Sequence, residues 1–239
     1  MKSIFCDDIE YVINNSPEKI INEIGENGYT RYINNLPEEI QLAAVKQYGW
    51  MIQYINNPSE KMKLIALKTY GLAIEYIADA SEEIKLAAVK ENGLAIEYIA
   101  DASEKIKLAA VKQNGLAIEF IADASEEIKL AAVKQFVYAI KYIDDPSEEL
   151  KLAAVRRTGY AITYIIDPSE NVQLAAVKQD GLIIYYINKP SEKVQLASLW
   201  NFEARKCVKC GLELPTIHYK WIHDDITTSE KYLKKNFKK

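Results

Sequence analysis

A 22-residue repeat runs through most of this sequence and constrains its fold more than any other feature. Serine recurs at that interval from Ser59 to Ser191, and residues 81–102, SEEIKLAAVKENGLAIEYIADA, are nearly identical to residues 103–124. A fixed period of about 20 to 50 residues is typical of solenoids, in which one small structural unit stacks on the next. The sequence therefore predicts tandem packing of one short unit.

Each repeat has the pattern of an α-helix followed by a shorter helix. In residues 81–102, Ser81 is the predicted N-cap, and the two glutamates after it suit the positive end of the helix dipole. Apolar side chains from Ile84 to Val89 point around most of the helix, so the helix needs neighbours on several sides. The paired alanines of this segment allow close stacking. Gly93 is predicted to end the helix in a left-handed conformation, before a second helix of two turns at most.

The repeat frame predicts the organisation of the whole chain. Residues 1–15 match the second half of a repeat and form a predicted N-terminal half-repeat cap. Eight tandem repeats follow in residues 16–190, then a capping helix in 191–205 and a basic C-terminal extension in 206–239. We therefore expect an all-α protein, an α-solenoid of short two-helix repeats with a small C-terminal extension.

The repeat unit, with its D-P-S turn and its LAAVKQNG segment, resembles known helical repeats. It is similar to leucine-rich variant repeats and, more loosely, to HEAT-like repeats, and looks closest to tandem LAAVKQNG repeats of phage, giant-virus and bacterial proteins. The resemblance covers about residues 9–204. It implies an α-solenoid and carries over no catalytic residue. Its viral character implies one version of the function, an inhibitor of a host nucleic-acid-processing or defence enzyme.

Charge is distributed unevenly along the chain. Residues 205–239 contain nine Lys or Arg against four acids, so this segment carries +5 and the remainder −9, given the net charge of −4. Because an acidic body repels phosphate, we expect the partner of the repeats to be another protein rather than a nucleic acid. The alternative is a nucleic-acid-binding protein that uses the basic C-terminal tail.

The composition argues against several other classes of protein. No run of 18 apolar residues is present, so we expect no membrane span. Three cysteines, an odd number, argue against a disulfide framework and favour a reducing, cytoplasmic compartment. No histidine precedes His218 and no phosphate loop, dinucleotide fingerprint or H-E-x-x-H motif occurs, so we expect no enzymatic activity.

One position in the second half of the repeat is aromatic throughout. We interpret this row as a packing spine in which the rings stack on one another, because Phe120 fits it without a hydroxyl group. The row comprises Tyr11, Tyr32, Tyr54, Tyr76, Tyr98, Phe120, Tyr142, Tyr164 and Tyr186.

Aromatic residues that depart from the consensus around the glycine turn are the candidates for partner binding. Packing alone does not require them, and Tyr and Trp are enriched among the residues that dominate interface energies. The alternative is local repacking around irregular repeats. The candidates, predicted to lie along one edge of the stack, are Tyr48, Trp50, Tyr70, Phe136, Tyr138, Tyr160 and Tyr185.

The C-terminal extension contains the one stretch with metal-ligand character. Cys207 and Cys210 form a C-x₂-C pair, and His218 and His223 follow within reach of it. These four side chains form a candidate tetrahedral zinc site, which would be structural because protein fills every coordination position. The alternative is a pair of reduced thiols beside surface histidines.

Overall fold

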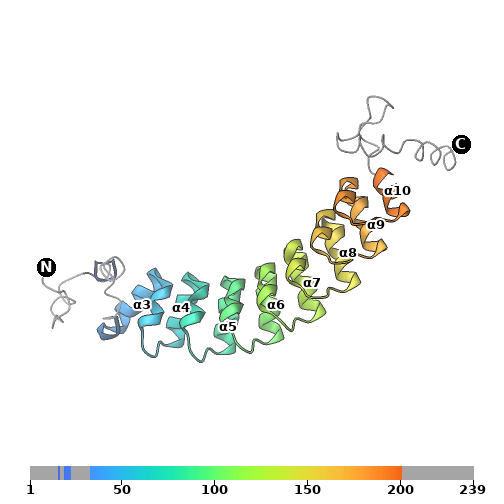
Figure 1. The fold of residues 1–239 in the computed structure, drawn as a ribbon. Helices are drawn as coiled ribbons and strands as arrows, with labels where there is room; N and C mark the ends of the chain where they lie inside the picture. The colour runs from blue at the N-terminus through green and yellow to red at the C-terminus, as the bar shows by residue number, and fades with distance from the viewer. Residues whose placement is uncertain (1–15, 17–18, 23–32, 201–239) are drawn as a thin grey trace, which may run out of the picture. The chain divides into compact units, whose positions relative to one another are not determined.

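A computed structural model describes residues 16, 19–22 and 33–200, and their side chains up to residue 198. The regular elements in this part of the chain are all helices, which repeat along the sequence (Figure 1). The predicted all-α solenoid fold is therefore confirmed. The predicted half-repeat cap in residues 1–15 and the basic extension in residues 206–239 lie outside the described residues.

Each complete repeat contributes a ten-residue α-helix and a six-residue 3₁₀ helix. The second helix is thus a 3₁₀ helix, labelled η. The α-helices are α3 (Glu38–Gln47), α4 (Glu60–Thr69), α5 (Glu82–Glu91), α6 (Glu104–Gln113), α7 (Glu126–Gln135), α8 (Glu148–Arg157), α9 (Glu170–Gln179) and α10 (Glu192–Trp200). The 3₁₀ helices are η2 (Gly49–Tyr54), η3 (Gly71–Tyr76), η4 (Gly93–Tyr98), η5 (Gly115–Phe120), η6 (Val137–Tyr142), η7 (Gly159–Tyr164) and η8 (Gly181–Tyr186).

The chain divides into two compact units after Asp145. The first unit contains α3 to α7 and η2 to η6, and the second contains α8 to α10 with η7 and η8. Within each unit, neighbouring α-helices contact one another, and so do neighbouring 3₁₀ helices. Each unit therefore has an α layer and a 3₁₀ layer, which Figure 1 shows for the first unit in blue to green.

The core lies between these two layers and is built from the same positions in each repeat. In the repeat of α5 and η4, Ala88, Val89 and Ala95 are completely buried, and Ile84 and Ile96 are at most 3% exposed. The alanines add little bulk, so the helices approach closely, as the sequence predicted for Ala88. Burial of the larger apolar side chains supplies the main favourable contribution to folding.

At α6, α9 and α10, the serine before the α-helix also connects its repeat to the previous one. Ser81 Oγ accepts a hydrogen bond from the Ile84 amide at 3.3 Å, which confirms the predicted N-cap. Ser103 accepts the equivalent bond and also donates its hydroxyl proton to Glu82 Oε1, at 2.5 Å. A single hydroxyl thus caps its own helix and holds the first turn of the preceding α-helix.

The predicted role of Gly93 is wrong, because this residue does not adopt the left-handed conformation. Positive φ occurs instead at the D-A-S turn, for example 52° at Asp101. Gly93 begins η4 at a point where a Cβ atom would lie 2.5 Å from the Ala110 carbonyl oxygen. Glycine is therefore required by the close approach of the next α-helix.

A glutamine side chain completes this close contact. The Gly93 amide donates to Gln113 Oε1 at 2.6 Å, and Gln113 Nε2 donates to the Glu91 carbonyl oxygen at 3.3 Å. The last turn of α6 thereby satisfies backbone groups at the junction of α5 and η4. Gln135 repeats the arrangement one unit later, accepting from the Gly115 amide at 2.7 Å.

Gly93→Ala should destabilise the fold by about 1–3 kcal/mol, because the added methyl group overlaps backbone atoms that cannot move independently. Thermal or denaturant unfolding followed by circular dichroism measures this cost. Ala100→Ser, which adds one atom at an exposed turn, is the control and should leave the midpoint nearly unchanged. Equal midpoints for both variants would contradict the close-approach explanation.

Ser103→Ala should lower stability by about 1–2 kcal/mol, since it removes both the helix cap and the bond to Glu82. Ser125 offers a matched comparison, because its side chain makes no cap hydrogen bond to α7. Ser125→Ala should cost clearly less in the same unfolding experiment. If the two substitutions cost the same, the hydroxyl group of Ser103 is not what connects the repeats.

Candidate interaction surface

The 3₁₀ layer presents the same pattern of side chains to its outer face in each repeat. In η4, Ala95 and Ile96 point into the core, Leu94 is half-buried, and Glu97 and Tyr98 are exposed. Neighbouring 3₁₀ helices of the first unit contact one another in order. Equivalent side chains therefore form rows across the outer face of this layer.

The aromatic row lies on this outer face rather than in the core, and its interpretation as a spine of stacked rings stays a prediction. Tyr76, Tyr98 and Phe120 are 36–40% exposed, and Tyr186 in the second unit is 57% exposed. The buried side chains of the repeat of α5 and η4 are instead alanine, valine and isoleucine. Tyr11 and Tyr32 lie outside the described residues.

Ten aromatic side chains of the first unit form what we call the aromatic strip. They share the 3₁₀ side of the unit and belong to η2 to η6 or to the residue just before a 3₁₀ helix. The members are Tyr48, Trp50, Tyr54, Tyr70, Tyr76, Tyr98, Phe120, Phe136, Tyr138 and Tyr142.

Ring contacts are concentrated at the two ends of the aromatic strip. Around η2, the ring centroids of Tyr48 and Trp50 are 6.1 Å apart, and those of Trp50 and Tyr54 are 6.2 Å apart. Around η6, Phe136 and Tyr138 lie 5.6 Å apart in an edge-to-face arrangement. These distances are in the favourable range for aromatic pairs, so both ends are preorganised clusters.

Five of the predicted contact residues, those from Tyr48 to Tyr138, belong to the aromatic strip. The other two lie in the second unit, where the ring of Tyr160 packs 5.7 Å from that of Tyr186. Tyr185 is 43% exposed, and partial burial raises the pKa of its hydroxyl group. Their role in binding stays a prediction.

Sequence reasoning missed the centre of the strip, namely Tyr76, Tyr98 and Phe120. Their constancy along the chain suggested a packing role, and for that reason they were not among the predicted contact residues. The glutamate that directly precedes each of these rings was the available signal for an exposed face.

Carboxylates give the centre of the aromatic strip a negative potential. Glu75, Glu97 and Glu119 are exposed, and η3, η4 and η5 contain no Lys or Arg. The charge of Glu97 raises the pKa of Tyr98, with smaller contributions from burial and Glu75. The negative field disfavours a tyrosinate at this position, so it must favour positive charge there.

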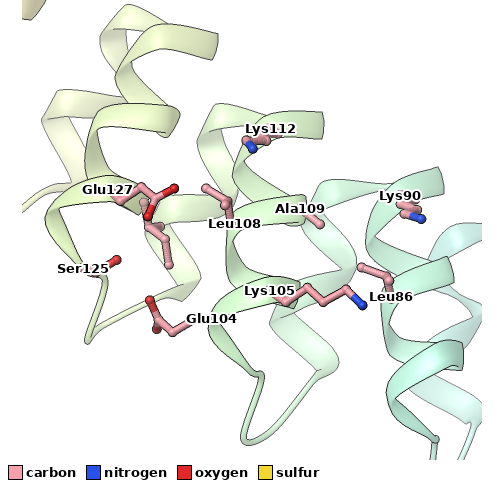
Figure 2. A pocket seen from close by; sticks show the side chains of 10 residues that line it. Leu86, Lys90, Glu104, Lys105, Leu108, Ala109, Lys112, Ser125 and Glu127 are labelled. Carbon is pink, nitrogen blue, oxygen red and sulfur yellow. The ribbon is translucent and has the colours of Figure 1, made fainter.

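The α layer of the first unit also has a surface groove, which lies over α5, α6 and α7. It is an open groove of about 420 Å³. Figure 2 shows Lys105 of α6 extending toward Leu86 of α5, with Glu127 of α7 on the other side. The groove is lined by Leu86, Lys90, Glu104, Lys105, Leu108, Ala109, Lys112, Ser125, Glu127 and Ile128. Because its wall carries charges of both signs, it favours neither a cation nor an anion.

The candidate zinc ligands Cys207, Cys210, His218 and His223 lie outside the described residues. Within the part that the structure describes, no group of three or more His, Cys, Asp or Glu side chains is arranged to hold a metal ion. None of the helices there is both long and apolar enough to cross a membrane.

Glu97→Gln should lower the pKa of Tyr98, because it removes the carboxylate that contributes most to the raised value. An NMR titration that follows the ring carbon bonded to the Tyr98 hydroxyl group measures the effect. Glu83→Gln removes an exposed charge from the α layer instead and should leave that titration unchanged. A Tyr98 pKa that is identical in all three proteins would contradict the negative field described above.

Comparison of the chain with protein-family models, with curated proteins and with solved structures gives no match. The repeat architecture rests on the geometry of the chain itself, and kinship with the repeat families named above stays a prediction.

Proposed function

We propose that this chain is a non-enzymatic protein-binding solenoid, an interaction scaffold or inhibitor, and that the aromatic strip is its contact surface. The observation that carries the proposal is the exposure of the strip. Six of its large side chains are 36–40% exposed on one layer of one unit. They are Tyr70, Tyr76, Tyr98, Phe120, Phe136 and Tyr138. Aromatic side chains are enriched in interfaces, and tyrosine and tryptophan dominate their binding energies.

The rigidity of the 3₁₀ layer supports this assignment. The backbone of η4 is fixed at its start by the bond from Gly93 to Gln113, and its inward side chains are fully packed. A surface that is already ordered loses little conformational entropy when a partner binds. The strip is therefore suited to recognition without a change of backbone structure.

Charge favours a protein over a nucleic acid as the partner of this surface. The carboxylates of Glu75, Glu97 and Glu119 would repel a phosphate backbone. One version of the proposal is an inhibitor that occupies the basic channel of a nucleic-acid-processing enzyme. It draws on the repeat resemblance and on the charge of −9 outside the C-terminal segment.

Tyr98→Ala combined with Phe120→Ala should weaken capture of the partner at least about tenfold, as expected when central aromatic anchors are truncated. The melting temperature should change little, because both rings are largely outside the core. The experiment is quantitative affinity capture from cells of the source organism, with and without nuclease treatment, comparing wild type and variant.

Lys90→Ala combined with Lys112→Ala, which alters exposed side chains of the groove on the α layer, is the matched control and should retain the partner. Equal capture by wild type and the aromatic double variant would overturn the proposal. Loss of all captured protein on nuclease treatment would instead favour nucleic-acid binding by the basic tail.

A further inference from the structure

We propose that the centre of the aromatic strip, across η3, η4 and η5, binds an extended Lys- or Arg-rich segment of a partner protein. This inference rests on the proposed function and specifies the chemistry of its partner. The site consists of three exposed rings, Tyr76, Tyr98 and Phe120, each directly preceded by a glutamate.

The arrangement of charge in these three repeats selects a cation. Each 3₁₀ helix and the turn after it carry one glutamate and one aspartate, without any Lys or Arg, in residues 71–80, 93–102 and 115–124. The glutamates and the turn aspartates are exposed, and of the aspartates Asp123 is already paired with Lys107 Nζ of α6 at 2.8 Å. An aromatic face beside a carboxylate binds an ammonium or guanidinium group through both cation–π attraction and ion pairing.

The aromatic strip already holds one cation against a ring, without a carboxylate beside it in the described part of the chain. In η6, where lysine replaces the glutamate, Lys141 Nζ lies 5.3 Å from the centroid of the Tyr142 ring. Tyr142 occupies the same position of the repeat as Tyr98. A ring at this position of the repeat can therefore accept a positive group on its face. In η3 to η5 the equivalent ring is preceded by a glutamate instead of a lysine.

The spacing of the repeats suits an extended peptide. Helices in contact lie about 8–10 Å apart, and neighbouring 3₁₀ helices of the first unit are in contact. Three residues of polyproline II conformation rise about 9 Å. Cationic side chains at every third residue of such a peptide would therefore face the three rings in turn. Arginine suits these sites best, because its planar group stacks on rings while it pairs with carboxylates.

The test is titration of the full chain with a fluorescent peptide of about twelve residues built from Arg-Pro-Pro repeats, which adopt polyproline II conformation. A peptide with citrulline in place of arginine keeps the shape and removes the charge. We expect the arginine peptide to bind at low salt at least about tenfold more tightly than the citrulline peptide. Equal binding of the two peptides would overturn the cationic assignment.

The protein variants locate the site. Glu75→Gln, Glu97→Gln and Glu119→Gln together should weaken binding of the arginine peptide by about tenfold or more. Each exposed ion pair contributes modestly to the binding free energy, so all three are removed at once. Tyr98→Leu combined with Phe120→Leu should weaken binding of the arginine peptide by a comparable factor. The matched control combines Glu39→Gln, Glu83→Gln and Glu127→Gln, which remove the same charge from the α layer and should change affinity less than about twofold. Equal losses in the two triple variants would mean attraction to net charge alone and would overturn the proposal.

The basic C-terminal segment of this chain is the competing occupant. A full-length variant with glutamine at its last five lysines distinguishes the two, namely Lys231, Lys234, Lys235, Lys238 and Lys239. If this variant binds the arginine peptide more than about tenfold more tightly than wild type, the tail occupies the strip and the partner assignment is overturned. Unchanged affinity supports an external partner.

Failure of this inference is distinguishable from failure of the proposed function. If the arginine peptide does not bind but Tyr98→Ala with Phe120→Ala still abolishes protein capture, the partner chemistry is wrong and the binding surface stands. If neither the peptide nor the captured protein depends on these rings, both proposals are wrong.

Discussion

The structure depends on the close approach between the glycine that begins most of the 3₁₀ helices and the last turns of the next α-helix. At Gly93 this approach leaves no space for a Cβ atom and brings the amide within 2.6 Å of Gln113 Oε1. The contact fixes the distance between repeats and the start of the outer layer at the same time. Because the 3₁₀ helix has only six residues, its outward side chains are positioned by this single anchored end.

One repeat of the first unit has lost this glycine. Val137 stands at the glycine position of η6, the last 3₁₀ helix of the first unit. A valine side chain is larger than the single Cβ that would already lie 2.5 Å from a carbonyl oxygen at Gly93. Phe136 and Tyr138 flank Val137, so the residue that replaces glycine stands between two exposed aromatic side chains.

Much of the fold could be predicted from the sequence because the same pattern of capping and apolar residues occurs in many repeats. A helix that is uncertain in one repeat is therefore supported by the others. The cap at Ser81 and the helix from Glu82 to Glu91 follow from local chemistry that recurs in most of the repeats. The role of Gly93 could not be predicted, since a left-handed turn and a close approach both select glycine, and only the neighbouring helix distinguishes them. The exposure of Tyr98 was missed for a similar reason. A row of identical rings is compatible with either side of a helix until the register of the 3₁₀ helix is known.

A tandem repeat copies its surface as faithfully as its core, so equivalent exposed groups recur at the spacing of the repeats. Duplicating the pair of Glu97 and Tyr98 at the neighbouring helices converts one weak exposed contact into a row whose spacing is set by the packing beneath it. A single exposed ion pair or cation–π contact contributes little to the free energy of binding. Several such contacts in register can hold one extended partner together. Once the first contact has formed, the remaining contacts form within the same complex at a high effective concentration. The acidic row ends where Gln53 and Lys141 replace its glutamate, which is where the repetition of this surface stops.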